Sequence, residues 1–217
     1  MLDLVIDDAS TDGTAGVLAR LEAEHGGDGV RVLTHPENRG KGAAVRSGVL
    51  AARGRAVVFL DADLAYAPDQ ARRALAAIEE GWDVAIGDRG HPDSRKLVAA
   101  SSLRAAGSQA INRLTHAVLL GSYRDTQCGL KGFRSDVGRF VFGQARVDGF
   151  AFDIEVLHLV ERHQLSLVEV PVEVTNSDRS TVSAAREALR LVADLFRIRH
   201  WAAEGRYEAD DQPPPAR

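Results

Sequence analysis

The segment Ala56-Val57-Val58-Phe59-Leu60-Asp61-Ala62-Asp63 is an apolar run that ends in two aspartates one residue apart. Its shortness and its β-branched residues are typical of a strand that is buried in a parallel sheet. Three further runs of this kind predict strands at Leu2–Ile6, Val30–Leu33 and Val84–Ile86.

Longer segments with helical features separate these strands. Asp12 or Gly13 can cap the first of the helices, and Pro68 suits the first turn of the third. The alternation predicts an α/β domain with a mostly parallel sheet flanked by helices. Helices are expected at Thr14–His25, Gly42–Arg53, Pro68–Gly81, Leu97–Leu119, Phe152–His163 and Val182–Ala203, and a strand broken by Pro171 at Leu165–Val174.

The composition excludes several classes of protein. The chain has 217 residues, of which 45% are hydrophobic and 27% charged, as is usual for a soluble globular domain. The net charge of −4 argues against a nucleic-acid-binding protein, and Cys128, the single cysteine, excludes a cysteine-rich metal site. No apolar run approaches the roughly 18 residues that cross a bilayer. We expect one domain over residues 1–203 and a disordered tail over residues 204–217, which contains three consecutive prolines.

Aspartates follow two of the predicted strands, at the sheet edge where ligands bind in open α/β folds. Asp7 and Asp8 follow the first strand, and Asp61 and Asp63 follow the third. Carboxylates at alternate positions can share a hard cation, Mg²⁺ or Mn²⁺, which keeps water and phosphate as its other ligands. A departing diphosphate needs such a cation because negative charge builds on it.

Other interpretations of these motifs stay open. The aspartates can cap helices or lie in solvated turns. Asn38-Arg39-Gly40-Lys41-Gly42, whose glycines and cations suit a phosphate, can equally be a glycine turn. Residues 10–14 also resemble the Asp-x-Asp-Gly-Thr loop of haloacid-dehalogenase-like phosphatases, but Ser10 replaces the nucleophilic aspartate.

Taken together, the segments resemble the family 2 glycosyltransferases of GT-A fold. Residues 7–14 are similar to the nucleotide-contacting motif of that family, and Asp61-Ala62-Asp63 to its metal-binding Asp-x-Asp. The likeness is greater to the polyprenyl-phosphate branch, which contains the dolichyl-phosphate β-glucosyltransferases and the dolichol-phosphate mannose synthases. It is carried by residues 38–48, by the Asp125-Thr-Gln-Cys-Gly stretch within residues 124–133, and by residues 150–155.

The resemblance implies an inverting, metal-dependent transfer of a hexose to a polyprenyl or dolichyl phosphate. UDP-glucose is the favoured donor, and GDP-mannose is the alternative. Because the second pKa of a phosphate monoester is about 6, the acceptor oxygen is already ionised at neutral pH and needs no strong base. Catalysis then depends on positioning and on charge stabilisation.

The resemblance also implies roles for individual residues. Asp61 and Asp63 would hold Mg²⁺ or Mn²⁺ against the diphosphate, Asp7 and Asp8 would bind the nucleoside, and Lys41 would reach the base or a phosphate. Asp63, Asp125 and Arg104 are the expected catalytic residues. Two further substrate contacts are expected: Arg89, which would contact the diphosphate, and Gln127 in the Asp125-Thr-Gln-Cys-Gly stretch. Asp153 is expected to contact the substrate through sugar hydroxyls. For both Asp153 and Glu155, the two interpretations are contact with sugar hydroxyls and capping of a helix.

Something cationic must also hold the acceptor phosphate. Arg104, Ser108 and Asn112 recur every four residues on one face of a predicted helix, and an arginine suits a phosphate well. We expect that face to receive the acceptor; a solvated polar stripe is the alternative. The alternative for Asp125 is that it caps a turn, and the alternative for Arg89 is that it lies at the protein surface.

The last predicted helix carries apolar residues on one face and arginines elsewhere. Such a helix can lie on an anionic membrane or pack on its own domain. With a lipid acceptor, we expect a cytoplasmic protein with peripheral contact at the cytoplasmic face of a membrane. The apolar face consists of Ala185, Leu189, Val192 and Phe196, and the arginines are Arg186, Arg190, Arg197 and Arg199.

Two departures from the family bear on activity. The family begins with a strand carrying Pro-x-Tyr-Asn-Glu and a helix, whereas this sequence starts at what resembles the second strand. We expect the functional polypeptide to begin roughly 30–50 residues upstream, so a non-catalytic nucleotide-sugar-binding fragment is the alternative function. The family often has Ser-Lys after its last strand, where this chain has Ser180-Thr181, with Arg179 as a substitute cation.

Overall fold

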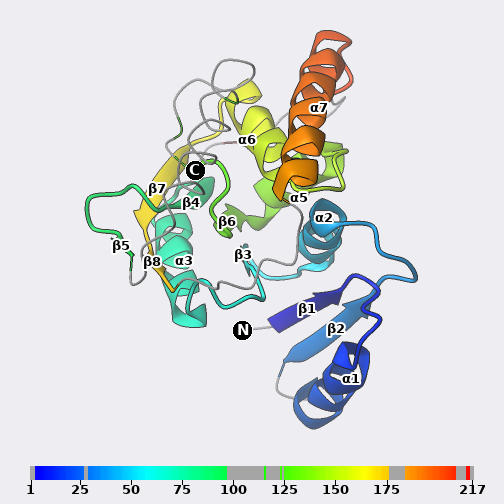
Figure 1. Ribbon diagram of the computed structural model, residues 1–217. Helices are drawn as coiled ribbons and strands as arrows, with labels where there is room; N and C mark the ends of the chain where they lie inside the picture. The colour runs from blue at the N-terminus through cyan, green and yellow to red at the C-terminus, as the bar shows by residue number, and fades with distance from the viewer. Residues whose placement is uncertain are drawn as a thin grey trace.

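A computed structural model describes residues 3–26, 29–96, 115, 123, 125–175, 184–208 and 214–215 (Figure 1). The strands are β1 Asp3–Asp7, β2 Val30–Thr34, β3 Ala56–Leu60, β4 Val84–Asp88, β5 Arg95–Lys96, β6 Leu130–Arg134, β7 Leu167–Pro171 and β8 Glu173–Val174. The α-helices are α1 Thr14–His25, α2 Lys41–Ala51, α3 Ala71–Glu79, α5 Ser135–Gln144, α6 Phe152–Arg162 and α7 Ala184–Ala203, and a 3₁₀ turn, η2, spans Pro68–Gln70.

The main sheet has the strand order β3-β6-β4-β7. β4 and β7 run parallel, and β6 is antiparallel to both of its neighbours. β1 and β2 form a separate parallel pair, which lies with α1 at one end of the molecule in Figure 1. The α/β prediction is therefore confirmed, with an antiparallel strand inserted into the sheet.

The main sheet is covered on both faces. Val84 and Ile86 belong to the larger core cluster, which contains α5, α6 and α7 residues, whereas Ala85 between them belongs to the cluster with Ala74 and Ala77 of α3. This alternation follows from the period of two along a strand. Cys128 is fully buried in the α3 cluster, as a small packed residue.

The sequence pattern predicts no strand at β6 and no helix at α5, although β6 is buried at every residue. The reason is that two of its five residues are cationic, which a buried strand rarely tolerates. Lys131 is paired with Asp153, and Arg134 with Asp83, each at 2.6 Å. Partners distant in the sequence thus make a charged segment fit the core.

Among the described residues, the strand at each edge of a sheet has a single strand partner. β1 pairs only with β2, and β3 pairs only with β6, among the residues that the structure describes. Residues of β3 are half-buried throughout, whereas those of β4 are fully buried. The expected additional strand stays a prediction.

The chain after α7 packs on the domain rather than leaving it. Tyr207, in the expected disordered tail, is fully buried in the core cluster. Residues 204–207 are thus part of the packed domain and not of a disordered tail, because Tyr207 finds a buried hydrogen-bond partner. No helix in the described part of the chain combines the length and apolarity needed to cross a membrane.

Candidate active site

Lys41 and Asp61 form the centre of the site. Lys41 begins α2, and its Nζ lies 2.8 Å from the carboxylate of Asp61, which follows β3. Burial alone would lower the pKa of Lys41, but the charges of Asp153 and Asp61 raise it above its usual value. Asp63 contributes in the same direction. Three carboxylates therefore act on the Lys41 ammonium group at this strand end.

The Asp125-Thr-Gln-Cys-Gly stretch passes directly beside Asp61. The backbone N–H of Asp61 donates to the carbonyl of Gly129 at 3.3 Å. A Cβ on Gly129 would overlap the Asp61 carboxylate, so glycine is required by close approach. The two stretches that carried the resemblance thus meet at one point.

The donor set fits a divalent ion. Asp63 is exposed, and one of its oxygens accepts a hydrogen bond from the N–H of Ala65 at 2.9 Å. Asp61 and Asp63 together offer hard carboxylate oxygens beside a position that already attracts an ammonium group. Among the described residues, no group of three or more histidine, cysteine, aspartate or glutamate side chains is arranged to hold a metal ion.

Asp7 and Asp8 organise the neighbouring turns. Asp7 accepts hydrogen bonds from the backbone and the hydroxyl of Ser10, at 3.1 and 2.5 Å. Asp8 accepts from the N–H groups of Arg39 and Gly40 and pairs with His35 at 2.6 Å. Burial alone would raise the pKa of Asp8, but these hydrogen-bond donors lower it below its usual value. Its carboxylate therefore positions the loop before α2.

The predicted phosphate cradle at the start of α2 is occupied by the protein itself. The N–H groups of Gly42 and Ala43 both donate to the carbonyl of Asp148, at 2.7 and 3.2 Å. Gly40 has a φ of +102°, and a Cβ there would lie 2.6 Å from the same carbonyl. The N–H groups of Gly42 and Ala43 are thus already used by the protein and are not available to a phosphate.

Lys131 and Asp153 form a buried ion pair beneath Lys41. Lys131 is fully buried, and it donates to Asp153 at 2.6 Å and to the carbonyl of Cys128 at 2.7 Å. Burial raises the pKa of Asp153, and Lys131 and Lys41 oppose this shift. No role is predicted for Lys131 from the sequence, but its ion pair holds the Asp153 carboxylate in place.

Arg89 and Asp125 form a second ion pair, although the sequence predicts a separate role for each of them. Arg89 Nε and an η nitrogen donate to the two oxygens of Asp125 at 2.5 and 2.7 Å. The N–H of Gln127 also donates to Asp125, at 3.3 Å. Burial alone would raise the pKa of Asp125, but Arg89 lowers it below its usual range. Asp125 thus orients Arg89.

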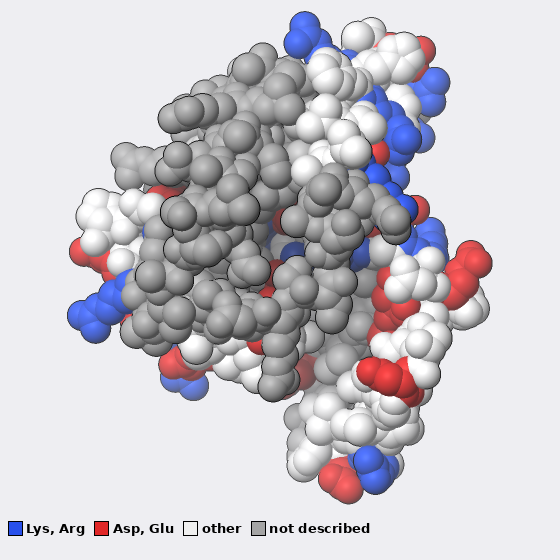
Figure 2. Space-filling model, in the orientation of Figure 1, with Lys and Arg blue, Asp and Glu red and all other residues white. Residues whose placement is uncertain are grey.

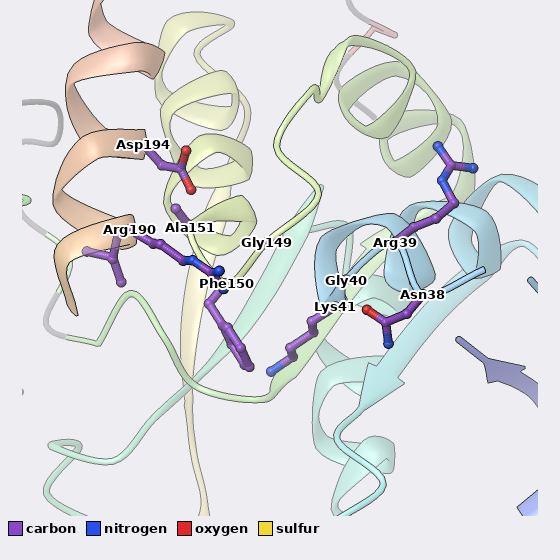
Figure 3. Close-up of a pocket in the computed structure, with 10 residues that line it drawn as sticks. Asn38, Arg39, Gly40, Lys41, Gly149, Phe150, Ala151, Arg190 and Asp194 are labelled. Carbon is purple, nitrogen blue, oxygen red and sulfur yellow. The ribbon is translucent and has the colours of Figure 1, made fainter. Parts of the chain in front are cut away.

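A pocket of about 350 Å³ opens beside Lys41. In Figure 3, Lys41 and Phe150 point toward one another, and Arg190 reaches in from α7. Lys41 Nζ lies 5.9 Å from the centre of the Phe150 ring. The lining residues are Asn38, Arg39, Gly40, Lys41, Gly149, Phe150, Ala151, Arg190, Leu191 and Asp194.

The expected acceptor face cannot be placed. Arg104, Ser108 and Asn112 lie outside the described residues, as do Arg124, Arg179, Ser180 and Thr181. Glu155, in contrast, is described and fully buried, and its carboxylate accepts from the N–H groups of Arg146 and Val147. The Glu155 carboxylate therefore accepts hydrogen bonds from the protein backbone, and this contradicts its interpretation as a sugar contact.

Comparison with known proteins decides the family. The family model described as Glycosyl transferase family 2 matches residues 4–139. The chain belongs to glycosyl transferase family 2. A dolichyl-phosphate β-glucosyltransferase of Drosophila melanogaster is 37% identical to this family 2 chain, over 90% of the chain and 62% of that protein. The human enzyme of the same name is 30% identical, over the same shares.

The chain thus spans 62% of the length of these relatives. Among solved structures, glucosyl-3-phosphoglycerate synthase from Mycobacterium tuberculosis, in complex with Mn²⁺ and UDP-glucose, has a TM-score of 0.64 at 18% identity. The match covers 91% of this family 2 chain and 67% of that one. Mannosyl-3-phosphoglycerate synthase from Rubrobacter xylanophilus has a TM-score of 0.58 at 21% identity, over 99% and 68%. These likenesses confirm the GT-A fold, and the phosphatase alternative is set aside.

Proposed function

We propose that this chain is the sugar-nucleotide-binding and catalytic part of an inverting glycosyltransferase that moves glucose from UDP-glucose to a polyprenyl phosphate such as dolichyl phosphate. The observation that carries the proposal is the meeting of Lys41, Asp61 and the glycine of the Asp125-Thr-Gln-Cys-Gly stretch at one sheet edge. The names of the relatives support glucose and dolichyl phosphate.

Each residue of the site has a proposed role in donor binding or transfer. Asp61 and Asp63 would hold Mg²⁺ or Mn²⁺, which when bound stabilises the negative charge on the departing nucleoside diphosphate. Lys41 contacts a diphosphate oxygen, and Asp7 and Asp8 order the turns that surround the nucleoside. Arg89, held in place by Asp125, adds a second cation for the diphosphate. The ionised acceptor phosphate attacks the anomeric carbon, so no protein base is required.

Glycolipid formation tests this function. The protein is incubated with radiolabelled UDP-glucose, Mn²⁺ and a polyprenyl phosphate, and the lipid phase is counted; GDP-mannose replaces UDP-glucose in a parallel assay. We expect glucose in the lipid phase, and a loss of at least a hundredfold in Asp63→Asn. Asp69→Asn, at an exposed position on η2, makes the same chemical change away from the site. Equal turnover in Asp63→Asn and Asp69→Asn would remove the metal role.

A second candidate is nucleotide-sugar binding without transfer. Among the described residues, β1 and β2 pair apart from the main sheet, and β3 is half-buried throughout. A donor site that rests on these less enclosed strands favours binding without the exact positioning that transfer requires. Calorimetry with UDP-glucose distinguishes the two functions: binding without any labelled lipid product supports this candidate.

The outward face of α7 is proposed to contact an anionic membrane at the cytoplasmic face. α7 packs on the domain through Leu191, Leu195 and Ile198, whereas Leu189 and Phe196 are 74% and 56% exposed. One face of α7 therefore packs on the domain, and the opposite face is left for the proposed contact with a membrane. Figure 2 shows basic side chains gathered along α7 at the upper right; exposed Arg190, Arg197 and Arg199 belong to this helix. Exposed apolar residues flanked by arginines suit an anionic lipid surface.

A further inference from the structure

Tyr207 lies in the turn after α7, far in the sequence from the site residues. Its ring is fully buried, with the rings of His158 and Trp201 centred 6.0 and 6.4 Å away. Its hydroxyl donates to Glu155 Oε1 at 2.6 Å. A buried tyrosine hydroxyl that donates to a buried carboxylate is a strong, charge-assisted contact.

Glu155 carries that contact to a loop. Its oxygens accept from the N–H of Arg146, at 2.9 and 3.0 Å, and from the N–H of Val147, at 2.8 Å. Arg146 also donates to the carbonyl of Arg206 at 3.2 Å, next to Tyr207. The loop between α5 and α6 is therefore tied to the turn after α7 on two sides.

The same loop supports the start of α2. The carbonyl of Asp148 accepts from the N–H groups of Gly42 and Ala43. The loop backbone lies so close that a Cβ on Gly42 would come within 2.5 Å of the Val147 carbonyl. α2 has no side-chain cap, so this carbonyl is what orders its first turn. That turn presents Lys41 to Asp61.

We infer that Tyr207 is a positioning residue for the donor site, acting through Glu155 and the loop of residues 145–149 on the first turn of α2 and on Lys41. This inference rests on the proposed function for its link to donor binding. Gly149 of this loop and the next residue, Phe150, also form one wall of the pocket beside Lys41. A contact made after the last helix thus sets the geometry at the sheet edge.

The charges around Glu155 agree with this role. Burial raises the pKa of Glu155, while the hydroxyl of Tyr207 and the N–H of Val147 oppose the shift. Arg46, on α2, also lowers it, and Arg46 donates to the carbonyl of Ala145 at 3.3 Å. Removing the Tyr207 hydroxyl leaves a buried carboxylate short of one donor, which weakens its hold on the loop.

Tyr207→Phe tests the inference, because it keeps the ring and removes only the hydroxyl. Ser166→Ala is the matched control: Ser166 donates its hydroxyl at 2.8 Å to Asp83, a carboxylate that is equally buried but precedes β4 at the other end of the sheet. Two quantities are measured in both variants: hydrogen exchange at the N–H groups of Arg146, Val147, Gly42 and Ala43, and the Kd of UDP-glucose with Mn²⁺.

We expect Tyr207→Phe to speed exchange at these four amides and to raise the Kd, each about tenfold. Ser166→Ala should change neither, and Glu155→Gln should reproduce the faster exchange. Unchanged exchange and Kd in Tyr207→Phe, or equal changes in Ser166→Ala, would overturn the inference. If the unmodified protein binds no UDP-glucose, the proposed function and the link to donor binding both fail, whereas the exchange data still show whether Tyr207 holds the loop.

Discussion

Lys131 and Asp153 form an ion pair 2.6 Å long in the interior, with the Lys131 side chain fully shielded from solvent. Removing one member of such a pair leaves an uncompensated buried charge. We therefore expect Lys131→Met to lower the free energy of unfolding by about 3–5 kcal/mol in urea denaturation.

The exposed pair Arg73–Glu173 provides the control for that measurement. Both side chains are about 40% accessible, and the pair spans 2.9 Å. Arg73→Met should cost no more than about 1 kcal/mol, since solvent screens exposed pairs. The double variant Lys131→Met, Asp153→Asn should be less destabilised than the sum of its single variants. An equal cost for Lys131→Met and Arg73→Met would show that the buried pair has no special importance.

Acidification tests the pair of Arg89 and Asp125. Arg89 lowers the pKa of Asp125, so this contact stabilises the fold above the ordinary aspartate pKa of about 3.9 and the contribution is lost as pH falls through the lower, folded-state value. Because Arg89 is partly exposed, we expect a contribution on the order of 1 kcal/mol. Unfolding free energies between about pH 5 and pH 2 should fall less steeply in Asp125→Asn than in Asp69→Asn. Parallel curves would contradict the assignment.

Gly129→Ala tests the close approach at Asp61. A Cβ at this position overlaps the Asp61 carboxylate, so the Asp61 side chain must leave its present position beside Lys41 Nζ. We expect at least a tenfold weaker binding of UDP-glucose with Mn²⁺, measured by calorimetry. Gly143→Ala, on α5 with no atom within 4 Å of the added methyl, should bind normally and gain up to about 1 kcal/mol of stability. Normal binding in both variants would refute the packing argument.

Vesicle sedimentation tests the outward face of α7. We expect the chain to bind phosphatidylserine vesicles, and Leu189→Ser with Phe196→Ser to weaken binding about tenfold or more because two exposed apolar contacts are lost. Val17→Ser with Leu50→Ser is the matched control, since these residues are 53% and 44% exposed on α1 and α2. A similar loss in both double variants would argue against a specific face.

Local sequence patterns predicted the regular parts of the fold. The strand at Ala56–Leu60 and the helix at Thr14–His25 lie where the pattern places them, because apolar runs and caps act locally. β6 was missed because its cations are neutralised by Asp83 and Asp153, which no local pattern reveals. For the same reason, a prediction of disorder after α7 could not anticipate that Tyr207 pairs with Glu155.

The candidate site was predicted in its residue types more than in its contacts. Asp61, Lys41 and the Asp125-Thr-Gln-Cys-Gly stretch lie together as the resemblance implies. The helix amides expected to hold a phosphate are instead used by Asp148, and Asp8 is used by the turn before α2. Such competition between protein and ligand for the same donors depends on loops that approach from elsewhere in the chain.

Asp61 and Asp63 are proposed to hold a divalent ion against the diphosphate of the donor. Calorimetric titration of UDP-glucose into the protein, with Mn²⁺ and then with the ion chelated, tests it most directly. We expect binding that weakens at least tenfold on chelation, and an Asp63→Asn variant that binds weakly and equally in both conditions. Binding that is unchanged by chelation, or by Asp63→Asn, would contradict it.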